Sequence, residues 1–312
     1  MTEQHYDIAI IGGGPAGLQA ALILARTRKR VIIFDAPEPP RNAASHGVHN
    51  FVGLDGLLPA QIREQAWQQI DVYNSAERRI ERIIDVQANA EGGFDVSGEA
   101  GGTPVTAKHV IVATGFRDVY PDVPGYLACW GKSIIACPFC DGYENRDRVW
   151  GLVITSLRAL EHLPILYQHW TKQAKIILHP DIAPEAAHLA DFAARGIPVH
   201  MGKIVEVHHT SGEVNAVTLD SGEQVEVGTL LWTPPEQALP LTQKLIANFG
   251  LDVDENDHLK TDAMHQTAVK GLWAVGDIQG WASSLGAAFA GSQAAYAIIR
   301  DWYPHHNQEK HA

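Results

Sequence analysis

Cysteine is scarce in this sequence, with only three among 312 residues. That is too few for the dense disulfide framework of small secreted domains. Long hydrophobic runs are also lacking: uninterrupted ones such as 8–11 and 285–290 fall far short of the roughly 20 residues that span a bilayer. The polar segment 1–6 resembles neither a secretory signal nor a transit peptide. We therefore expect a cytoplasmic protein with no membrane span.

Positively charged residues are also fewer than negatively charged ones. The chain has 24 Lys and Arg against 36 Asp and Glu, a formal net charge of −12. A nucleic-acid-binding surface needs concentrated basic residues, and the small groups at 26–30 and 78–82 are typical of solvated faces and helix ends. The 16 histidines follow no metal-site spacing. We expect neither nucleic-acid binding nor a metal site.

The N-terminal segment has the pattern of a strand, a tight turn and a helix. An isoleucine-rich run, 6–11, leads into a glycine turn, and an Ala/Leu-rich stretch follows. The spacing Gly-x-Gly-x-x-Gly lets the backbone approach a pyrophosphate and aims a helix N-terminus at it. A second strand, 31–34, ends at Asp35, about 20 residues on, where a carboxylate can hold ribose hydroxyls. The sequence predicts a dinucleotide site that includes the turn residues Gly12, Gly14, Pro15, Ala16 and Gly17.

Two later motifs indicate that the dinucleotide is FAD. One strand ends in the small-residue turn Ala113-Thr114-Gly115, and another ends in Gly276-Asp277 ahead of a helix rich in small residues. In order and spacing, the three motifs resemble the low-molecular-weight thioredoxin reductase family over nearly the whole chain. The resemblance implies bound FAD, a homodimer, and a contact between Asp277 and the ribityl-phosphate side of the flavin.

Proline-containing segments, which interrupt helices and strands, indicate that the first domain is discontinuous in the sequence. Prolines lie in 116–124 and again in 233–235, and a second alternation of strands and helices runs between them. We predict an α/β fold of two doubly wound Rossmann-like domains of the three-layer ββα type, the second inserted in the first. The FAD-binding domain would comprise residues 1–117 and 236–312. The inserted domain, similar to an NADPH domain, would comprise residues 118–235.

The inserted domain carries a cysteine pair in Cys137-Pro138-Phe139-Cys140. Two intervening residues allow the sulfurs to close a small disulfide ring, and nearby amides can lower the pKa of one thiol. A zinc site would require a second such pair, which the sequence lacks. By resemblance to the family, Cys140 would lie next to the flavin, Cys137 would attack the partner's disulfide, and Asp141 would carry the proton. A structural disulfide is the alternative.

The inserted domain departs from its NADPH-using relatives at the turn where they carry glycines. Val153, Ile154 and Thr155 stand there instead, and β-branched side chains would occupy the space that a pyrophosphate needs. The next strand ends in the residues 178–181, which include one acid and no arginine to hold a 2′-phosphate. We therefore predict an electron donor other than NADPH.

The segment 41–53 also departs from the reductases. It resembles the fungal and bacterial dithiol oxidases of the same fold, which close disulfides in small metabolites and return electrons to oxygen, although their redox pair is typically followed by His and not by Asp. His46 and His49 are candidates for proton carriers near the flavin, and packing or turn roles suit them equally. Trp302 or Tyr303 is a candidate to stack on the flavin; capping the last helix or packing at a dimer contact is the alternative.

Three functions are compatible with these residues. The leading hypothesis is a reductase that passes electrons from a donor other than NADPH, such as a ferredoxin, through FAD and Cys137/Cys140 to a thioredoxin-like protein. The second is a dithiol oxidase that forms a disulfide in a small substrate with O2 as acceptor. The third is a non-catalytic flavin redox sensor, which the intact cysteine pair disfavours.

Overall fold

The computed structural model describes residues 5–280 and 282–302, which form two compact units. The first unit contains the chain up to Ala43, Pro59–Arg117 and the chain from Glu236 onward. The second contains Ala44–Leu58 and Asp118–Pro235. Residues 44–58 therefore pack within the second unit, whereas the sequence prediction grouped them with the first.

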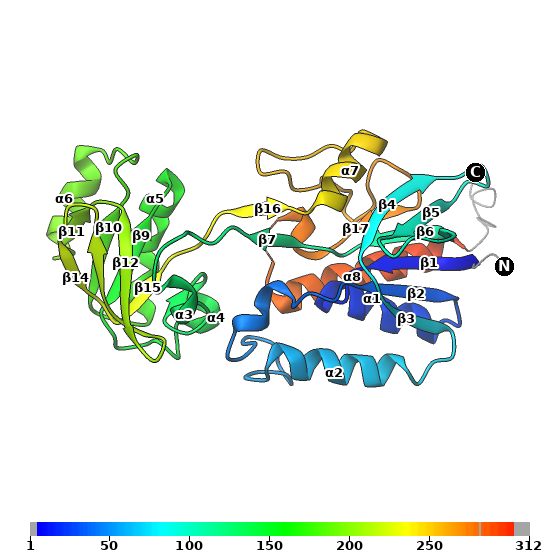
Figure 1. The fold of residues 1–312 in the computed structure, drawn as a ribbon, viewed down its shortest axis with the longest axis horizontal. Coiled ribbons are helices and arrows are strands. Elements are labelled where there is room, and N and C mark those ends of the chain that lie inside the picture. The colour runs from blue at the N-terminus through cyan, green and yellow to red at the C-terminus, as the bar shows by residue number, and fades with distance from the viewer. Residues whose placement is uncertain (1–4, 281, 303–312) are drawn as a thin grey trace, which may run out of the picture. The chain divides into compact units, whose positions relative to one another are not determined.

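A seven-stranded sheet forms the centre of the first unit (Figure 1). Its strands are β1 (His5–Ile11), β2 (Val31–Asp35), β3 (Ala76–Ile80), β4 (Ile83–Ala88), β5 (Phe94–Gly98), β6 (Val105–Val112) and β17 (Leu272–Ala274). The order is β3-β2-β1-β6-β5-β4, with β17 paired to β6. The pairs among β3, β2, β1, β6 and β17 are parallel, and β5 is antiparallel to both β4 and β6. The carboxyl ends of β1, β2, β6 and β17 therefore share one edge.

Helices α1 (Pro15–Arg26) and α8 (Ser284–Asp301) lie side by side along one face of this sheet (Figure 1). Small residues allow them to approach closely: a Cβ at Gly291 would lie only 2.1 Å from the Ala16 carbonyl oxygen. The other elements of the unit are α2 (Pro59–Ile70), α7 (Pro240–Phe249), β7 (Phe116–Asp118), which pairs with β16 (Glu236–Ala238), and the 3-10 turns η1 (Arg41–Ala44) and η3 (Gly276–Gln279). The α7 side chains Leu241 and Leu245 join the core on the opposite face.

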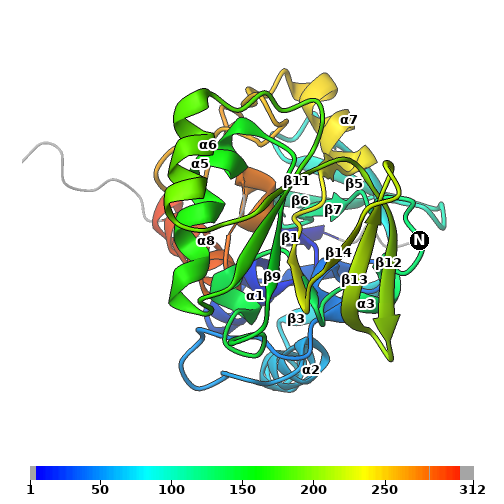
Figure 2. The same cartoon turned by 90° about the vertical axis from the view of Figure 1, so that its left-hand side faces the viewer.

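The second unit has a five-stranded parallel sheet between helices and a small antiparallel sheet (Figure 2). Its parallel strands are β8 (Ile134–Ile135), β9 (Trp150–Ile154), β10 (Ala174–Leu178), β11 (Val199–Met201) and β15 (Thr229–Leu231). Helices α5 (Leu157–Leu166) and α6 (Ala186–Ala194), with the turn η2 (Tyr167–His169), cover one face. The strands β12 (Ile204–Thr210), β13 (Glu213–Leu219) and β14 (Gln224–Glu226) cover the other. Two short helices, α3 (Tyr126–Cys129) and α4 (Pro138–Asp141), flank β8 along the chain.

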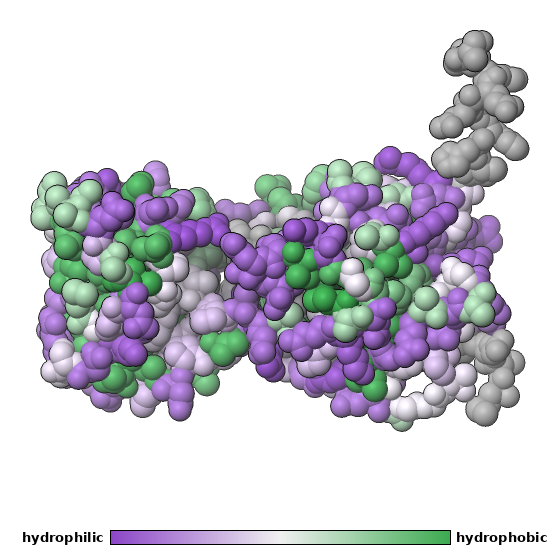
Figure 3. All heavy atoms as spheres, turned by 90° about the horizontal axis from the view of Figure 1, so that it is seen from above, coloured by the Kyte–Doolittle hydropathy of each residue, from purple (hydrophilic) through white to green (hydrophobic). Residues whose placement is uncertain are grey.

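The surface of both units mixes hydrophilic and hydrophobic residues, and hydrophilic ones are abundant on the face seen in Figure 3. This agrees with the formal net charge of −12, which favours solubility. Within 5–280 and 282–302, no helix combines the length and apolarity that crossing a bilayer requires.

Candidate active site

The glycine turn after β1 is shaped for a phosphate group. A Cβ at Gly12, whose φ is +120°, would lie 2.3 Å from the Ala113 carbonyl oxygen, and a Cβ at Gly17 would lie 1.9 Å from the Gly12 oxygen. A Cβ at Gly14, in contrast, would have no described atom within 4 Å. Gly14 is also the N-cap of α1, and because it has no side chain it leaves the first amides of the helix without a side-chain cap. The turn therefore fits a pyrophosphate held by backbone N–H groups.

Asp35, at the end of β2, is held by an arginine that the sequence analysis missed. Arg63 on α2 places one guanidinium nitrogen 2.7 Å from the Asp35 carboxylate, and its other terminal nitrogen donates to the Gly13 carbonyl at 3.1 Å. Arg78 lies 3.8 Å from the same carboxylate. Asp35 is only 5% exposed, so these arginines supply the opposite charge that a buried carboxylate needs. No motif marks Arg63, because it is 28 residues from Asp35 along the chain.

The two later motifs meet the glycine turn at the carboxyl edge of the sheet. A Cβ at Gly115 would lie 3.8 Å from Cβ of Asp277, and a Cβ at Gly276 would lie 3.1 Å from Cβ of Ala16. Gly115 (φ +65°) and Gly276 (φ +77°) adopt left-handed backbone that favours glycine. The Thr114 hydroxyl is buried with no hydrogen-bond partner in the described chain, and an FAD hydroxyl or phosphate oxygen would satisfy it. These residues fit FAD.

Asp277 forms part of a charged cluster. Burial raises the pKa of the Asp277 carboxyl, and Arg41 beside it opposes the shift. The Arg41 guanidinium lies 3.3 Å from the Asp277 carboxylate and 3.0 Å from that of Glu236. Glu236 in turn lies 2.9 Å from His258, whose other ring nitrogen is 2.9 Å from Asp254. Sequence analysis did not select these partners, because Arg41 is 236 residues from Asp277 along the chain and no motif marks Glu236, Asp254 or His258.

The cysteine pair lies at the start of α4 in the second unit. Cys137 is buried at the N-cap position and Cys140 is partly buried; both are free thiols. The Cys137 sulfur accepts hydrogen bonds from the Cys140 thiol and from the backbone of Cys140 and Phe139, and these lower its pKa to about 7 despite burial. The same contact, with burial, raises the pKa of Cys140. The pair thus has a thiolate-forming sulfur and a protonated neighbour.

Asp141 follows the pair directly. Burial, and then the nearby Glu144 carboxylate, raise the pKa of Asp141 to about 6, while His49 and His46 act in the opposite direction. A carboxyl group with a pKa near 6 can both accept and donate a proton close to neutral pH.

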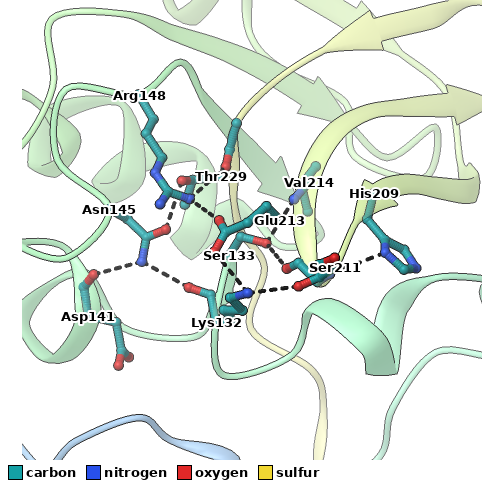
Figure 4. Close-up of polar contacts among 12 residues, drawn as sticks. Lys132, Ser133, Asp141, Asn145, Arg148, His209, Ser211, Glu213, Val214 and Thr229 are labelled. Carbon is teal, nitrogen blue, oxygen red and sulfur yellow. Dashed lines mark hydrogen bonds and ion pairs between the residues drawn. The ribbon is translucent and has the colours of Figure 1, made fainter.

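A polar network behind α4 fixes the position of Asp141, as Figure 4 shows. The buried Asn145 amide donates to the Asp141 carbonyl at 3.0 Å and to the Lys132 carbonyl at 3.1 Å, and its oxygen accepts from the Thr229 hydroxyl at 3.0 Å. The Trp150 indole donates to the Asn145 carbonyl at 2.9 Å. Because the side chain of Asn145 has these three partners, the C-terminal end of α4 is anchored to the sheet.

The predicted histidines lie in the second unit, on the segment 44–58. The His46 ring nitrogen Nδ1 is 2.6 Å from the Gly131 carbonyl oxygen. The His49 ring lies 3.6 Å from Asp55 on one side and 3.6 Å from Glu144 on the other. Both histidines lie in the same unit as the redox turn, residues 137–140, and both favour the Asp141 carboxylate that follows this turn. Their proximity to a flavin stays a prediction.

The turn after β9 contains no glycine. The buried strand residues Val153 and Ile154 are followed by the exposed Thr155 and then by Ser156, whose hydroxyl accepts from the Ala159 amide at 3.1 Å and caps α5. Beyond β10, His179 lies 3.5 Å from Asp181. The first turn of α5 is thus partly satisfied without a phosphate.

Two other predictions concern the end of the chain and metals. Trp302 packs edge-on against the His109 ring at 5.3 Å, and the Lys29 ammonium lies 3.9 Å over it, so its stacking on a flavin stays a prediction. Tyr303 is outside the described residues.

Across 5–280 and 282–302, no group of three His, Cys, Asp or Glu side chains is gathered as metal ligands.

Comparison with known proteins agrees with this arrangement. The family "Pyridine nucleotide-disulphide oxidoreductase" matches residues 6–156 and 169–298. The chain is 32% identical to "Thioredoxin reductase tcpT" of Claviceps purpurea, over 88% of this chain and 87% of the relative.

Solved structures agree on the fold. The crystal structure of HlmI superposes with a TM-score of 0.86 at 30% identity, covering 95% of this chain and 92% of that one. An oxidoreductase from Agrobacterium tumefaciens gives 0.85 at 31% identity, covering 96% and 98%. The predicted α/β fold of two Rossmann-like domains, the predicted resemblance and the predicted cofactor are confirmed. The chain belongs to the pyridine nucleotide-disulphide oxidoreductase family and is a thioredoxin reductase-like, FAD-binding oxidoreductase.

Proposed function

We propose that this chain is a thiol–disulfide oxidoreductase in which Cys137 and Cys140 exchange electrons between FAD and a disulfide outside the protein. The main support for this proposal is the environment of the Cys137 sulfur. Hydrogen bonds from Cys140 and from the Phe139 backbone lower the pKa of Cys137, which favours its thiolate. The thiolate is the form that attacks a disulfide sulfur.

In the reductive direction, the Cys137 thiolate attacks one sulfur of the substrate disulfide, and the other sulfur leaves as a thiolate. Cys140 then attacks the Cys137 sulfur, which releases the second substrate sulfur and forms the Cys137–Cys140 disulfide. Asp141 takes the Cys140 proton and delivers it to the departing sulfur. The chemistry that FAD supplies when bound is the transfer of two electrons, which restores both thiols. The glycine turn, Thr114 and Asp277 would hold it.

The variants Cys137→Ser and Cys140→Ser test this proposal. Each should keep bound FAD and lose turnover with a disulfide substrate by about a thousandfold or more, because a hydroxyl cannot form the disulfide. Cys129→Ala is the matched control, since Cys129 is a buried thiol in the core of the same unit. Near-normal turnover in either serine variant would reject the proposal.

We further propose that electrons come from a donor other than NADPH, such as a ferredoxin, and pass to a thioredoxin-like protein. The glycine-free turn after β9 and its self-capped helix support the first part. The name of the Claviceps relative, thioredoxin reductase, supports the second. Flavin absorbance under anaerobic conditions tests the donor: NADPH should bleach it slowly and reduced ferredoxin promptly. Prompt bleaching by NADPH would contradict the proposal.

A dithiol oxidase is the second candidate. His46 and His49 beside the redox turn favour it, because imidazoles there can accept protons from a dithiol substrate. Rapid hydrogen peroxide formation with a small dithiol such as dithiothreitol, and no reduction of thioredoxin, would select this function over the first.

A homodimer is proposed as the assembly. Leu285, Phe289 and Tyr296 of α8 are exposed, which is consistent with an apolar contact between copies. Light scattering should give twice the 34.0 kDa chain mass, and Phe289→Glu should lower it towards the monomer.

A further inference from the structure

The segment 44–58 contacts the redox turn within the second unit, although its chain neighbours on both sides belong to the first unit. It contacts the surroundings of the cysteine pair at three points. His46 Nδ1 meets the Gly131 carbonyl oxygen at 2.6 Å, and the Asn50 amide donates to the Phe139 carbonyl, inside the Cys-x-x-Cys turn, at 2.6 Å. His49 Nε2 lies 3.6 Å from the Glu144 carboxylate.

His49 is held in place within this segment. Its Nδ1 lies 3.6 Å from one oxygen of Asp55, whose other oxygen accepts from the Asn50 backbone amide at 2.8 Å. A Cβ at Gly47 would lie only 3.0 Å from His49 Nε2, so the ring packs against the backbone there. The imidazole is thus fixed between two carboxylates, one on its own segment and one just beyond α4.

The groups around Asp141 make the charge of His49 relevant to its proton. Glu144 disfavours the Asp141 carboxylate, whereas His49 and His46 favour it. The negative charge on Asp141 in turn raises the pKa of both Cys137 and Cys140. A positive charge on the His49 imidazole would therefore act on the same equilibrium that governs proton transfer to and from the thiol pair.

We propose that His49 is a positioning residue of the redox reaction: held between Asp55 and Glu144, its positive charge sets how readily Asp141 exchanges a proton with the cysteine pair. This inference rests on the proposed acid–base role of Asp141.

The pH dependence of single-turnover reaction between the reduced holoenzyme and an aromatic disulfide, dithiobis(nitrobenzoate), tests the proposal. His49→Gln removes the charge, so the acidic midpoint assigned to Asp141 should rise by about 0.5 pH unit, the size expected for one charge that acts largely through water. His49→Arg keeps a positive charge and should hold the midpoint near the wild-type value. His162→Gln is the control, since His162 contacts the Arg158 carbonyl on α5.

A second variant guards against a folding defect in the His49 substitutions. Asp55→Asn retains the oxygen that accepts from Asn50 and removes the carboxylate charge that holds the His49 ring in place, so it should shift the midpoint in the same direction by less. Unchanged midpoints in both His49→Gln and Asp55→Asn, or equal shifts in the Gln and Arg variants, would overturn the inference. The proposed function is tested separately by Cys137→Ser. It stands if this variant loses turnover, whatever the His49 variants show, and it is rejected if this variant keeps turnover.

Discussion

Alanine substitutions at Gly17 and Gly14 should separate the folding role of the glycine turn from its role in binding FAD. Both positions belong to the same motif, but their surroundings differ. A Cβ at Gly17 would lie 1.9 Å from the Gly12 carbonyl oxygen and 3.3 Å from Cβ of Ala113, whereas a Cβ at Gly14 would have no described atom within 4 Å. The motif spacing alone does not distinguish the two.

The expected magnitudes follow from these distances. Gly17→Ala forces a carbonyl of the backbone to move, and overpacking of this kind costs about 1–3 kcal/mol, which exceeds the gain of about 1 kcal/mol in helix propensity at most sites. Gly14 has a φ of −82°, which alanine adopts freely, so Gly14→Ala should change the unfolding free energy of the apoprotein by less than about 0.5 kcal/mol. Its methyl group would, however, occupy space needed by the pyrophosphate.

Two measurements check the pair. Urea unfolding of the flavin-free protein should show a net loss of about 1 kcal/mol for Gly17→Ala, the overpacking cost less the gain in helix propensity, and almost none for Gly14→Ala. Titration with FAD should show binding weakened about tenfold or more for Gly14→Ala, equivalent to about 1.4 kcal/mol. The reasoning is refuted if the Gly14→Ala apoprotein unfolds as easily as Gly17→Ala, or if it binds FAD with wild-type affinity.

Three other substitutions probe the site. Cys140→Ala removes the thiol that donates to Cys137, so the midpoint for alkylation of Cys137 by iodoacetamide should rise from about 7 towards the ordinary thiol value; an unchanged midpoint would show that Cys140 is not the cause. Arg63→Gln leaves the buried carboxylate of Asp35 with only a more distant arginine, and urea unfolding should show a loss of about 2 kcal/mol; a loss below about 0.5 kcal/mol would mean that the pair adds little. Burial raises the pKa of Asp141 from 3.8 to about 6, which means that the folded protein holds the proton of this carboxyl more tightly than the unfolded chain does. The contribution of Asp141 to the unfolding free energy is therefore greatest below pH 3.8 and is lost as the pH rises through 6. Asp141→Asn should therefore be more stable than wild type at pH 7, by at most about 3 kcal/mol, and equal to it near pH 3; a pH-independent difference would contradict this.

Features set by neighbouring residues could be predicted from the sequence. The Gly12, Gly14 and Gly17 spacing predicts a strand–turn–helix, because the backbone conformations and close approaches are local to that turn. The Cys137 and Cys140 spacing likewise predicts that two sulfurs meet, since both lie on one short turn. The order of three such motifs along the chain was enough to predict the fold class and the FAD cofactor.

Partners that are distant along the chain were decided only by the tertiary structure. The Arg63–Asp35 pair spans 28 residues, the Asn50–Phe139 contact 89 and the Arg41–Asp277 contact 236. The same holds for the segment 44–58, whose position over the redox turn depends on how its ends leave one unit and pack in the other. No periodicity or spacing encodes such contacts, because each depends on the summed packing of many elements and not on the residues next to it.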